Sequence, residues 1–296
     1  MMHILDFFAF SRFSLTALVV SVVIAGCVSG GPGGDRPAPV LTTEKIAAIV
    51  ASPDRSAADR ANDVRRKPVD MLDFIGMRPG MVAFDVSAGG VYTTELLARA
   101  TGPTGRVYGQ SAPPNSNRAP PAAPEGGGAQ QPQPIPQAAA PRRTSAMALA
   151  ERAKNPAVSN ILAVVRPFED PAPPELASQS FDLVTQMFNY HDLGHLGVDR
   201  AAMNKAIYAA LKPGGVYVIA DHAGRAGTGI SESGTLHRVV EDFVINEVKE
   251  AGFRLAERGM FLSNPNDPRD RNTPDPPQPK DEFVLKFVKP GSANAR

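Results

Sequence analysis

The sequence predicts an α/β protein with a doubly wound sheet of seven strands, mostly parallel and closed by an antiparallel C-terminal hairpin strand. Short apolar runs alternate with helical patterns along the 296 residues, and a hydrophobic content of 43% is enough for a core. The run at 81–86 is almost entirely apolar, as in a parallel strand buried on both faces. The last two predicted strands have no helix between them, so they must pair as a hairpin.

The predicted strands are apolar runs that end at turn residues. They cover 81–86, 106–109, 160–165, 181–188, 215–220, 254–262 and 283–288. The predicted helices lie between the strands and carry apolar residues at a helical period. They cover 57–75, 92–100, 145–154, 199–211 and 235–251.

Local signals mark several helix ends. Pro68 forces a break or a fresh start within 57–75, because proline cannot donate the backbone hydrogen bond of a helix interior. The helix at 235–251 is expected to be the longest. Its apolar residues Val240, Phe243 and Val248 stand at near-helical spacing, and Gly252 is its expected stop.

The N-terminus has the pattern of a sorting signal. Residues 13–26 carry no charge and are too few for a membrane-spanning helix, which needs about 20 residues, but they fit a secretory signal peptide. The end of this run, Ile24-Ala25-Gly26-Cys27, resembles the lipobox of bacterial lipoproteins. The resemblance implies a signal peptide at 1–26, a lipid on Cys27, and export to the cell envelope or periplasm with an anchor in a membrane. Ordinary cleavage and an uncleaved anchor are the alternatives.

Two segments contain too few large apolar residues to fold. Residues 27–40 are rich in Gly and Pro and are expected to form a flexible tether. Residues 111–143 hold 9 Pro and 8 Ala and cannot bury enough surface to offset the entropy of ordering. We therefore predict a disordered insertion within one domain at 41–290, followed by a tail at 291–296.

Charge and cysteine content exclude two classes of protein. With 31 basic and 30 acidic residues, the chain lacks the basic excess of a nucleic-acid binder. A single Cys excludes an intramolecular disulfide framework and a thiolate metal cluster. The expected partners are a small molecule and, through Cys27, a membrane; no nucleic acid is expected.

Several motifs follow one another in an informative order. The strand that ends near Asp85 is followed by Ser-Ala-Gly-Gly at 87–90 and then by a helix, and 211–215 reads Leu-Lys-Pro-Gly-Gly. Together with the strand at 105–109 and the terminal hairpin, these pieces resemble class I S-adenosylmethionine-dependent methyltransferases. Further pieces resemble a bacterial family of predicted methyltransferases; they lie at 78–81, 89–97, 190–192, 221–222, 227–229, 235–238 and 284–287. The resemblance implies a Rossmann-like fold, S-adenosyl-L-methionine as cofactor, and methyl transfer to an unidentified small-molecule acceptor.

The resemblance also implies where the cofactor binds. It assigns the cofactor to the loop after the first strand, which contains Asp85, Ser87, Ala88, Gly89 and Gly90. Asp85 is expected to order this loop or to accept hydrogen bonds from the ligand's amino group. Glycine lets the backbone approach a ligand closely. Further cofactor residues follow later strands, and they are Gln110, Glu169, Asp170 and Asn189.

Two departures from the family pattern concern cofactor binding. Ser87 and Val91 stand where the family favours glycine, and the Val91 side chain is expected to crowd the methionine part of the cofactor. Gln110 stands where an acidic residue normally binds the ribose hydroxyls, and it carries no charge.

Polar residues that follow the fourth and fifth strands are the catalytic candidates. Because carboxyl ends of parallel strands meet at one edge, His191, Asp192, His222 and His237 are predicted to share a cleft. His191 or His222 is expected to take a proton from the acceptor, with Asp192 or the neighbouring Asp221 orienting the ring. The alternative is that these polar groups only cap strand ends and bind loop backbone.

The same residues allow a metal site as an alternative. Several His and Asp side chains at one edge can hold a divalent ion. His191 and His195 stand at helical spacing, but Gly194 argues against a helix there, so no metal site is predicted.

Two functions remain open at this point. The leading one is methyl transfer from S-adenosyl-L-methionine, and its rival is a non-catalytic ligand-binding lipoprotein on a degenerate methyltransferase scaffold. Export favours the rival, because the cofactor is made in the cytoplasm. A dinucleotide oxidoreductase is disfavoured, since the chain has no G-x-G-x-x-G motif and no acidic residue after the second strand.

Overall fold

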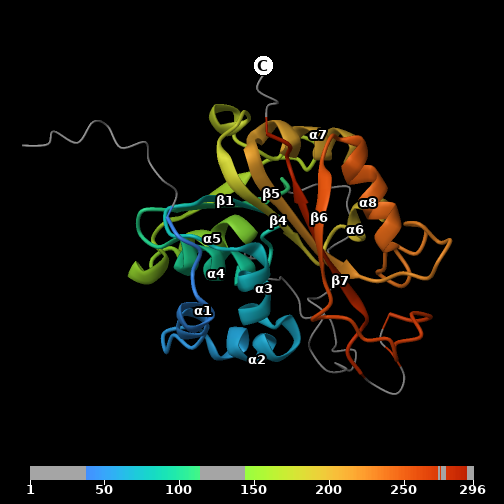
Figure 1. Cartoon of the computed structure of the whole chain (residues 1–296), viewed down its shortest axis with the longest axis horizontal. Helices are drawn as coiled ribbons and strands as arrows, with labels where there is room; N and C mark the ends of the chain where they lie inside the picture. The colour runs from blue at the N-terminus through green and yellow to red at the C-terminus, as the bar shows by residue number, and fades with distance from the viewer. Residues whose placement is uncertain (1–37, 114–143, 273, 275–277, 292–296) are drawn as a thin grey trace, which may run out of the picture. The chain divides into compact units, whose positions relative to one another are not determined.

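Seven strands form one sheet in the order β3-β2-β1-β4-β5-β7-β6 (Figure 1). The strands are β1 (Val82–Val86), β2 (Arg106–Ser111), β3 (Ile161–Val165), β4 (Phe181–Met187), β5 (Leu211–His222), β6 (Arg254–Gly259) and β7 (Glu282–Val288). Strands β1 to β5 pair in parallel, whereas β7 runs antiparallel to both β5 and β6. The predicted Rossmann-like α/β fold, with its doubly wound sheet and antiparallel C-terminal hairpin strand, is therefore confirmed.

This computed structural model describes residues 38–113, 144–272, 274 and 278–291. The predicted signal peptide, Cys27, most of the tether and insertion, and nearly all of the tail lie outside the described residues, so those predictions stay predictions. Within the described ranges, no helix is both long and apolar enough to cross a membrane.

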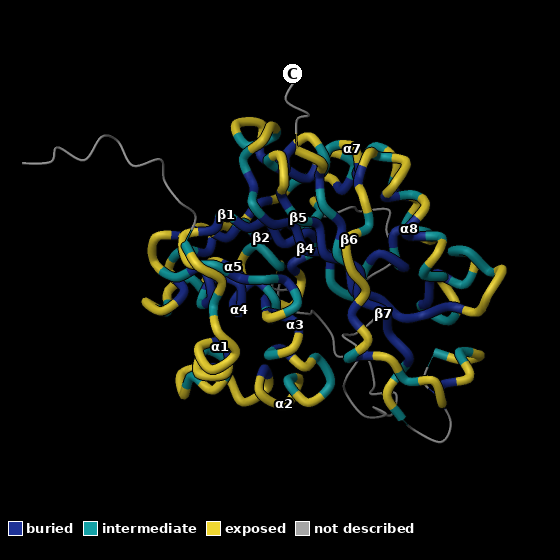
Figure 2. The backbone as a smooth tube through the Cα atoms, viewed as in Figure 1, coloured by how far each residue is buried: buried dark blue, intermediate teal, exposed yellow. Residues whose placement is uncertain are grey.

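Helices cover both faces of the sheet (Figure 1). On one face lie α3 (Pro68–Ile75), α4 (Tyr92–Thr101) and α5 (Ser145–Arg152), over an apolar cluster that includes Leu97 and Leu149. On the other face lie α7 (Arg200–Ala210) and α8 (Glu241–Glu250), over a second cluster that includes Ile207 and Val248. The central strands between these two layers are mostly buried (Figure 2).

The break predicted at Pro68 is confirmed. Helix α2 (Ala57–Arg66) ends one residue before Lys67, and Pro68 is the first residue of α3. Lys67 takes a left-handed conformation with φ of +42° between the two helices. Proline suits the first helical position, because the N–H that it lacks would have no partner there.

The helix predicted at 235–251 begins only at Glu241. Residues before it run beside the end of β5, where the Val239 N–H donates to the His222 carbonyl at 3.1 Å. This backbone pairing forms in place of the helix that the spacing of the apolar residues predicts. His237 therefore lies in a loop over the sheet edge, with φ of +50°, and not on a helix.

Two further helices were not expected. Helix α1 (Thr43–Val50) is capped by the Thr42 hydroxyl, which accepts from the Lys45 N–H at 3.4 Å. The short helix α6 (Asp192–His195) forms although it contains Gly194, so the sequence argument against a helix there was wrong. Gly194 has a packing reason: a Cβ atom there would lie 2.8 Å from side-chain atoms of both Ile230 and Ser233.

Candidate functional site

The loop between β1 and α4 has a glycine-type backbone at two residues that are not glycine. Ser87 and Val91 both have φ of +63°, in the left-handed region that side chains disfavour. The Val91 side chain is buried in the core cluster beneath α4, and only 4% of it is exposed. Most of the Val91 side chain therefore packs in the core, although Val91 also lines the hollow beside the exposed Gly89 and Gly90, and the expectation that it crowds a cofactor stays a prediction.

Asp85 lies beneath this loop, at the end of β1. Its carboxylate accepts hydrogen bonds from the hydroxyls of Thr94 (2.6 Å) and Thr185 (2.8 Å), which ties β1 to α4 and β4. Burial raises the pKa of Asp85 to about 6, although these two hydrogen bonds oppose the change. This geometry fits the role of ordering the loop region and does not fit a carboxylate exposed to a ligand.

Gln110 is also engaged by its own chain. Its Oε1 accepts from the Ser87 N–H at 2.9 Å, and its Nε2 donates to the Arg166 carbonyl at 2.7 Å. Its backbone carbonyl accepts from the Ala88 N–H at 2.7 Å. The buried Gln110 side chain thus fastens the loop to the ends of β2 and β3, and the expected hydrogen bond to a ribose is not what this geometry provides.

The N-terminus of α4 has no side-chain cap. Its N-cap residue is Val91, which cannot accept a hydrogen bond through its side chain. The first N–H groups of a helix have no partner within the helix, and together with the helix dipole they attract anions. With Gly89 and Gly90 exposed immediately before it, this end of α4 offers backbone donors to a ligand carboxylate.

The other three predicted cofactor residues differ in which of their side-chain atoms already have a hydrogen-bond or ion-pair partner. Glu169 accepts from the Asp199 N–H at 3.3 Å, and Asp170 pairs with Arg166. Asn189 donates through Nδ2 to Asp192 at 3.1 Å, but its buried Oδ1 has no hydrogen-bond partner among the described residues. Among these three residues, Asn189 is the one with a buried acceptor that has no partner in the part of the chain described.

His191 is held between two carboxylates at the ends of β4 and β5. Its Nδ1 lies 2.6 Å from Oδ1 of Asp221, and its Nε2 lies 3.1 Å from Oδ1 of Asp192. Burial lowers the pKa of His191, but the charges and hydrogen bonds of these two carboxylates outweigh burial and raise it to about 10. Since both ring nitrogens are engaged, the arrangement does not fit the predicted role of His191 as a general base.

Asp192 also lies close to the imidazoles of His237 and His195. Nδ1 of His237 lies 3.0 Å from the same Oδ1, and Nδ1 of His195 lies 3.9 Å from it. Burial raises the pKa of Asp192, but the hydrogen bonds and charges of His191 and His237 lower it to about 2. We call His191, Asp192 and His237 the histidine cluster. Its side chains are 3%, 26% and 19% exposed respectively, so it opens to the surface at Asp192 and His237.

His222 lies behind this cluster and is buried. Its ring centroid is 5.3 Å from that of His191 and 5.6 Å from that of Phe188. Its Nδ1 lies 3.0 Å from Oε1 of Glu282, at ion-pair distance but without hydrogen-bond geometry. With 1% of its surface exposed, His222 does not fit the predicted role of a base that meets an acceptor.

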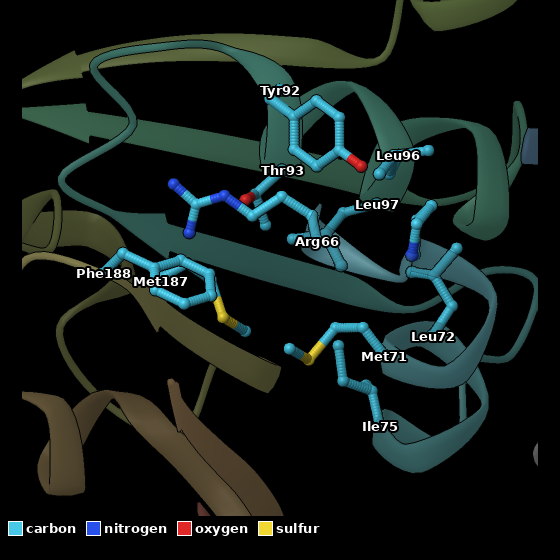
Figure 3. A pocket seen from close by; sticks show the side chains of 11 residues that line it. Arg66, Met71, Leu72, Ile75, Tyr92, Thr93, Leu96, Leu97, Met187 and Phe188 are labelled. Atoms are coloured by element: carbon cyan, nitrogen blue, oxygen red, sulfur yellow. The ribbon is translucent and has the colours of Figure 1, made fainter. Parts of the chain in front are cut away.

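An apolar pocket lies between α3, α4 and the end of β4 (Figure 3). It has about 360 Å³ of empty space, open solvent included. Arg66 reaches across the pocket, with its guanidinium carbon 3.4 Å from the centre of the Phe188 ring. Its Nη1 is buried without a hydrogen-bond partner in the described part of the chain, and burial together with the neighbouring Arg65 lowers the pKa of Arg66 to about 10.

Sequence reasoning missed two charged residues of this edge. Glu282 faces His222 because β7 pairs with β5 in the register that puts these two residues opposite each other. That register depends on the packed hairpin and is not readable from the chain. Arg66 ends a polar helix and shows the pattern of a solvent-exposed residue, so no sequence signal marks its guanidinium as partly buried.

Solved structures are similar to this chain over most of its length. A SAM-dependent methyltransferase from Aquifex aeolicus matches with a TM-score of 0.51 and 15% identity, covering 84% of this chain and 99% of its own. The [4+2]-cyclase SpnF matches with a TM-score of 0.50 and 12% identity, covering 87% of this chain and 100% of its own. No protein-family model matches the sequence, and no curated protein matches it.

These similarities establish the fold. The chain has the Rossmann-like fold found in a SAM-dependent methyltransferase, and the cyclase has that fold as well. At such low identity the fold does not fix the reaction, which must be argued from the site.

Proposed function

We propose that this protein is an S-adenosyl-L-methionine-dependent methyltransferase that acts on a small-molecule acceptor. The observation that carries the proposal is the backbone of the loop after β1. Ser87 and Val91 hold the left-handed conformation without being glycine, which costs of order 1–3 kcal/mol per residue and is typical of binding sites. The result is an exposed Gly89–Gly90 turn before an uncapped helix at the carboxyl edge, the edge at which such sheets bind ligands.

The residues of this edge fit the methionine part of the cofactor. The N–H groups at Gly90 and at the start of α4 would hold its carboxylate, because they are donors at a positive helix end, whereas the Gly89 N–H already donates to the Ser87 carbonyl at 2.8 Å. The orphan Oδ1 of Asn189 would accept from its ammonium group. When bound, the cofactor supplies a methyl group on a positively charged sulfur, which a nucleophile can attack.

The acceptor would lie against the histidine cluster. Strand β4 pairs directly with β1, so the cluster at the end of β4 is next to the glycine turn. His237 and Asp192 are its surface-exposed members and would contact the acceptor, while Asp221 positions His191 from below. Holding two reactants in place accounts for a large part of the rate in such transfers.

A labelling experiment tests the proposal. The full-length chain is incubated with a small-molecule extract and cofactor labelled in the methyl group. Label should appear in a small molecule, and it should not appear with the Gly89→Val variant. An absence of label with a chain that binds the cofactor would contradict the proposed reaction.

The engaged side chains of the β1–β3 ends support a second candidate, a non-catalytic ligand-binding lipoprotein. Gln110, Glu169 and Asp170 already have partners within the chain, so the ribose and adenine of the cofactor would find few free side chains there. This candidate predicts that the chain binds neither the cofactor nor its demethylated product. Binding of both, blocked by Gly89→Val, would exclude it.

We also propose that the chain is exported and anchored in a membrane of the cell envelope through a lipid on Cys27. The support is the sequence pattern that ends at Cys27, after an uncharged apolar run. Cys27→Ser should release the protein from the membrane fraction or stall its processing. Two results together would contradict this: Cys27→Ser stays in the membrane fraction, and the natural protein has the mass of an unlipidated chain.

A further inference from the structure

Three metal-binding atoms converge in the histidine cluster. One ligand atom from each of His191, Asp192 and His237 lies within 4.8 Å of the other two. Nε2 of His191 and Nδ1 of His237 are 3.1 and 3.0 Å from Oδ1 of Asp192. Ligand atoms bonded at about 2.1 Å to a tetrahedral ion are about 3.4 Å apart, so these two nitrogen–oxygen distances suit an ion after small outward shifts.

The surroundings of these atoms fix their orientation. Asp221 engages Nδ1 of His191 at 2.6 Å, which turns Nε2 toward the cluster. Asp221 is itself fixed, because it also accepts from the backbone N–H groups of His191 (2.7 Å) and His222 (2.8 Å). Asn189 engages the other oxygen of Asp192. A carboxylate behind a histidine ligand is the usual support of a metal site.

The charges of the cluster also suit a cation. Asp192 and Asp221 bring two negative charges to His191, whereas Glu282 beside His222 is paired with Arg65 at 3.5 Å. In the metal-free state, Nδ1 of His237 is hydrogen-bonded to Oδ1 of Asp192, and Nε2 of His191 lies at ion-pair distance from the same oxygen. A cation would replace both: the proton on Nε2 of His191 would leave to solvent, and that on Nδ1 of His237 would move to Nε2.

We propose that the histidine cluster binds one divalent transition-metal cation through His191, Asp192 and His237. Two imidazoles and one carboxylate suit ions such as Zn²⁺, Fe²⁺, Mn²⁺ or Co²⁺. Three protein ligands leave a coordination position open, as in catalytic metal sites. The exposure of Asp192 and His237 places the access to this position on the surface side. His195 is not part of the set, because its Nδ1 is engaged by the Ser233 hydroxyl at 3.0 Å.

The role of the cation rests on the proposed methyl transfer, but its binding does not. A hydroxyl of the acceptor bound at the open position would lose its proton to solvent more readily, because a metal ion lowers the pKa of an oxygen ligand. His237 would then act as a ligand. If no cation binds, Nε2 of His237 is the ring nitrogen left to meet the acceptor directly.

The test uses Co²⁺ as the probe, without cofactor or acceptor. The full-length chain is stripped with a chelator and titrated with Co²⁺, and both visible absorption and bound metal per chain are measured. We expect one Co²⁺ per chain, displaced by Zn²⁺. Asp192→Asn and His237→Asn should each weaken binding at least about 10-fold, and Asp221→Asn about 10- to 100-fold. Asp170→Asn, a change to an exposed carboxylate outside the cluster, should bind as the unchanged chain does.

Two results would overturn the proposal: no saturable Co²⁺ binding by the unchanged chain, or unchanged affinity in His237→Asn. His237→Asn decides the test even if Asp192→Asn fails to fold. We expect His237→Asn to fold, because His237 lies in a partly exposed loop and asparagine tolerates its φ of +50°. Co²⁺ binding without methyl transfer would leave the metal site standing and remove the proposed function. Methyl transfer without Co²⁺ binding would support the proposed function and remove the metal site.

Discussion

The two halves of the sheet's carboxyl edge differ in how far the chain satisfies its own polar groups. At the ends of β1 and β2, Asp85 and Gln110 are buried and hydrogen-bonded within the chain. At the ends of β4 and β5, two imidazoles share one oxygen of Asp192, and Oδ1 of Asn189 has no partner in the described ranges. The polar side chains of the β1–β2 half have their hydrogen bonds saturated within the chain, whereas those of the β4–β5 half can still bind a ligand.

This difference separates two tasks. In the β1–β2 half the polar side chains of Asp85 and Gln110 face inward, so a ligand there must be recognised by the backbone of Gly90 and the start of α4. The β4–β5 half presents side chains that can bind charge or move a proton. Changes in the first half should therefore alter stability or cofactor binding, whereas changes in the histidine cluster of the second half should alter the reaction.

The largest expected effect is a pH dependence of stability that originates at Asp85. The unfolded chain loses this proton near pH 3.8, whereas the folded chain keeps it up to about pH 6. Unfolding therefore releases a proton in this window, so the free energy of unfolding falls as pH rises from about 4 to 6. A pKa raised from 3.8 to about 6 corresponds to about 3 kcal/mol.

Chemical denaturation across this pH range measures the effect. Asp85→Asn should flatten the profile between pH 4 and 6, while Asp170→Asn, at an exposed position, should keep it. An identical slope in Asp85→Asn and the unchanged chain would show that Asp85 is not the buried proton site.

Gly89→Val should lower cofactor affinity by about 100-fold or more, about 2.7 kcal/mol, because its side chain would project over the donor turn. The fold should tolerate it, since a Cβ atom there lies 3.7 Å from the Ser145 hydroxyl, an ordinary contact. Gly291→Val is the matched control, at a glycine with nothing within 4 Å of its Cβ position. Titration calorimetry and thermal melts measure both variants. Full cofactor affinity in Gly89→Val would place the cofactor elsewhere.

His237→Asn should slow methyl transfer by up to about 100-fold and leave cofactor affinity unchanged, because His237 belongs to the histidine cluster on the acceptor side. Lys205→Gln, at an exposed residue of α7, is the control. Initial rates and equilibrium binding, measured on the same preparations, give both quantities. If His237→Asn lost cofactor affinity but kept its rate, His237 would serve cofactor binding and not the reaction, contrary to this prediction.

Gln110→Ala should have the smallest effect, a loss of about 1–2 kcal/mol in the free energy of unfolding. It leaves the Ser87 N–H and the Arg166 carbonyl without their partner, and unmet buried groups cost about this much. Denaturant unfolding measures the loss. If stability stays constant while cofactor affinity drops, Gln110 contacts the cofactor and the β1–β2 half is not saturated.

The fold was predictable because its signals are local. The apolar run at 81–86, the break at Pro68 and the terminal hairpin each follow from a few neighbouring residues, and each corresponds to an observed element. The prediction failed at 235–240, where the chain pairs with the end of β5, and at Gly194, whose close packing against Ser233 keeps glycine in a helix. Both failures come from tertiary contacts that override local preference.

The site was predictable in its composition but not in its geometry. The sequence brought His191, Asp192 and His237 to one edge, because strand ends of a parallel sheet meet there. It did not show that His191 has both nitrogens engaged, or that Val91 keeps the loop backbone by burying its side chain. These outcomes depend on rotamers and on the register of β7, which one sequence does not encode locally.

Titration calorimetry of the full-length chain with S-adenosyl-L-methionine and with its demethylated product tests the central claim most directly. The account predicts one site per chain, dissociation constants on the order of micromolar, and loss of both heats in Gly89→Val. An absence of binding at millimolar ligand would contradict the account. It would mean that the edge at β1–β2 is closed to the cofactor as well as saturated.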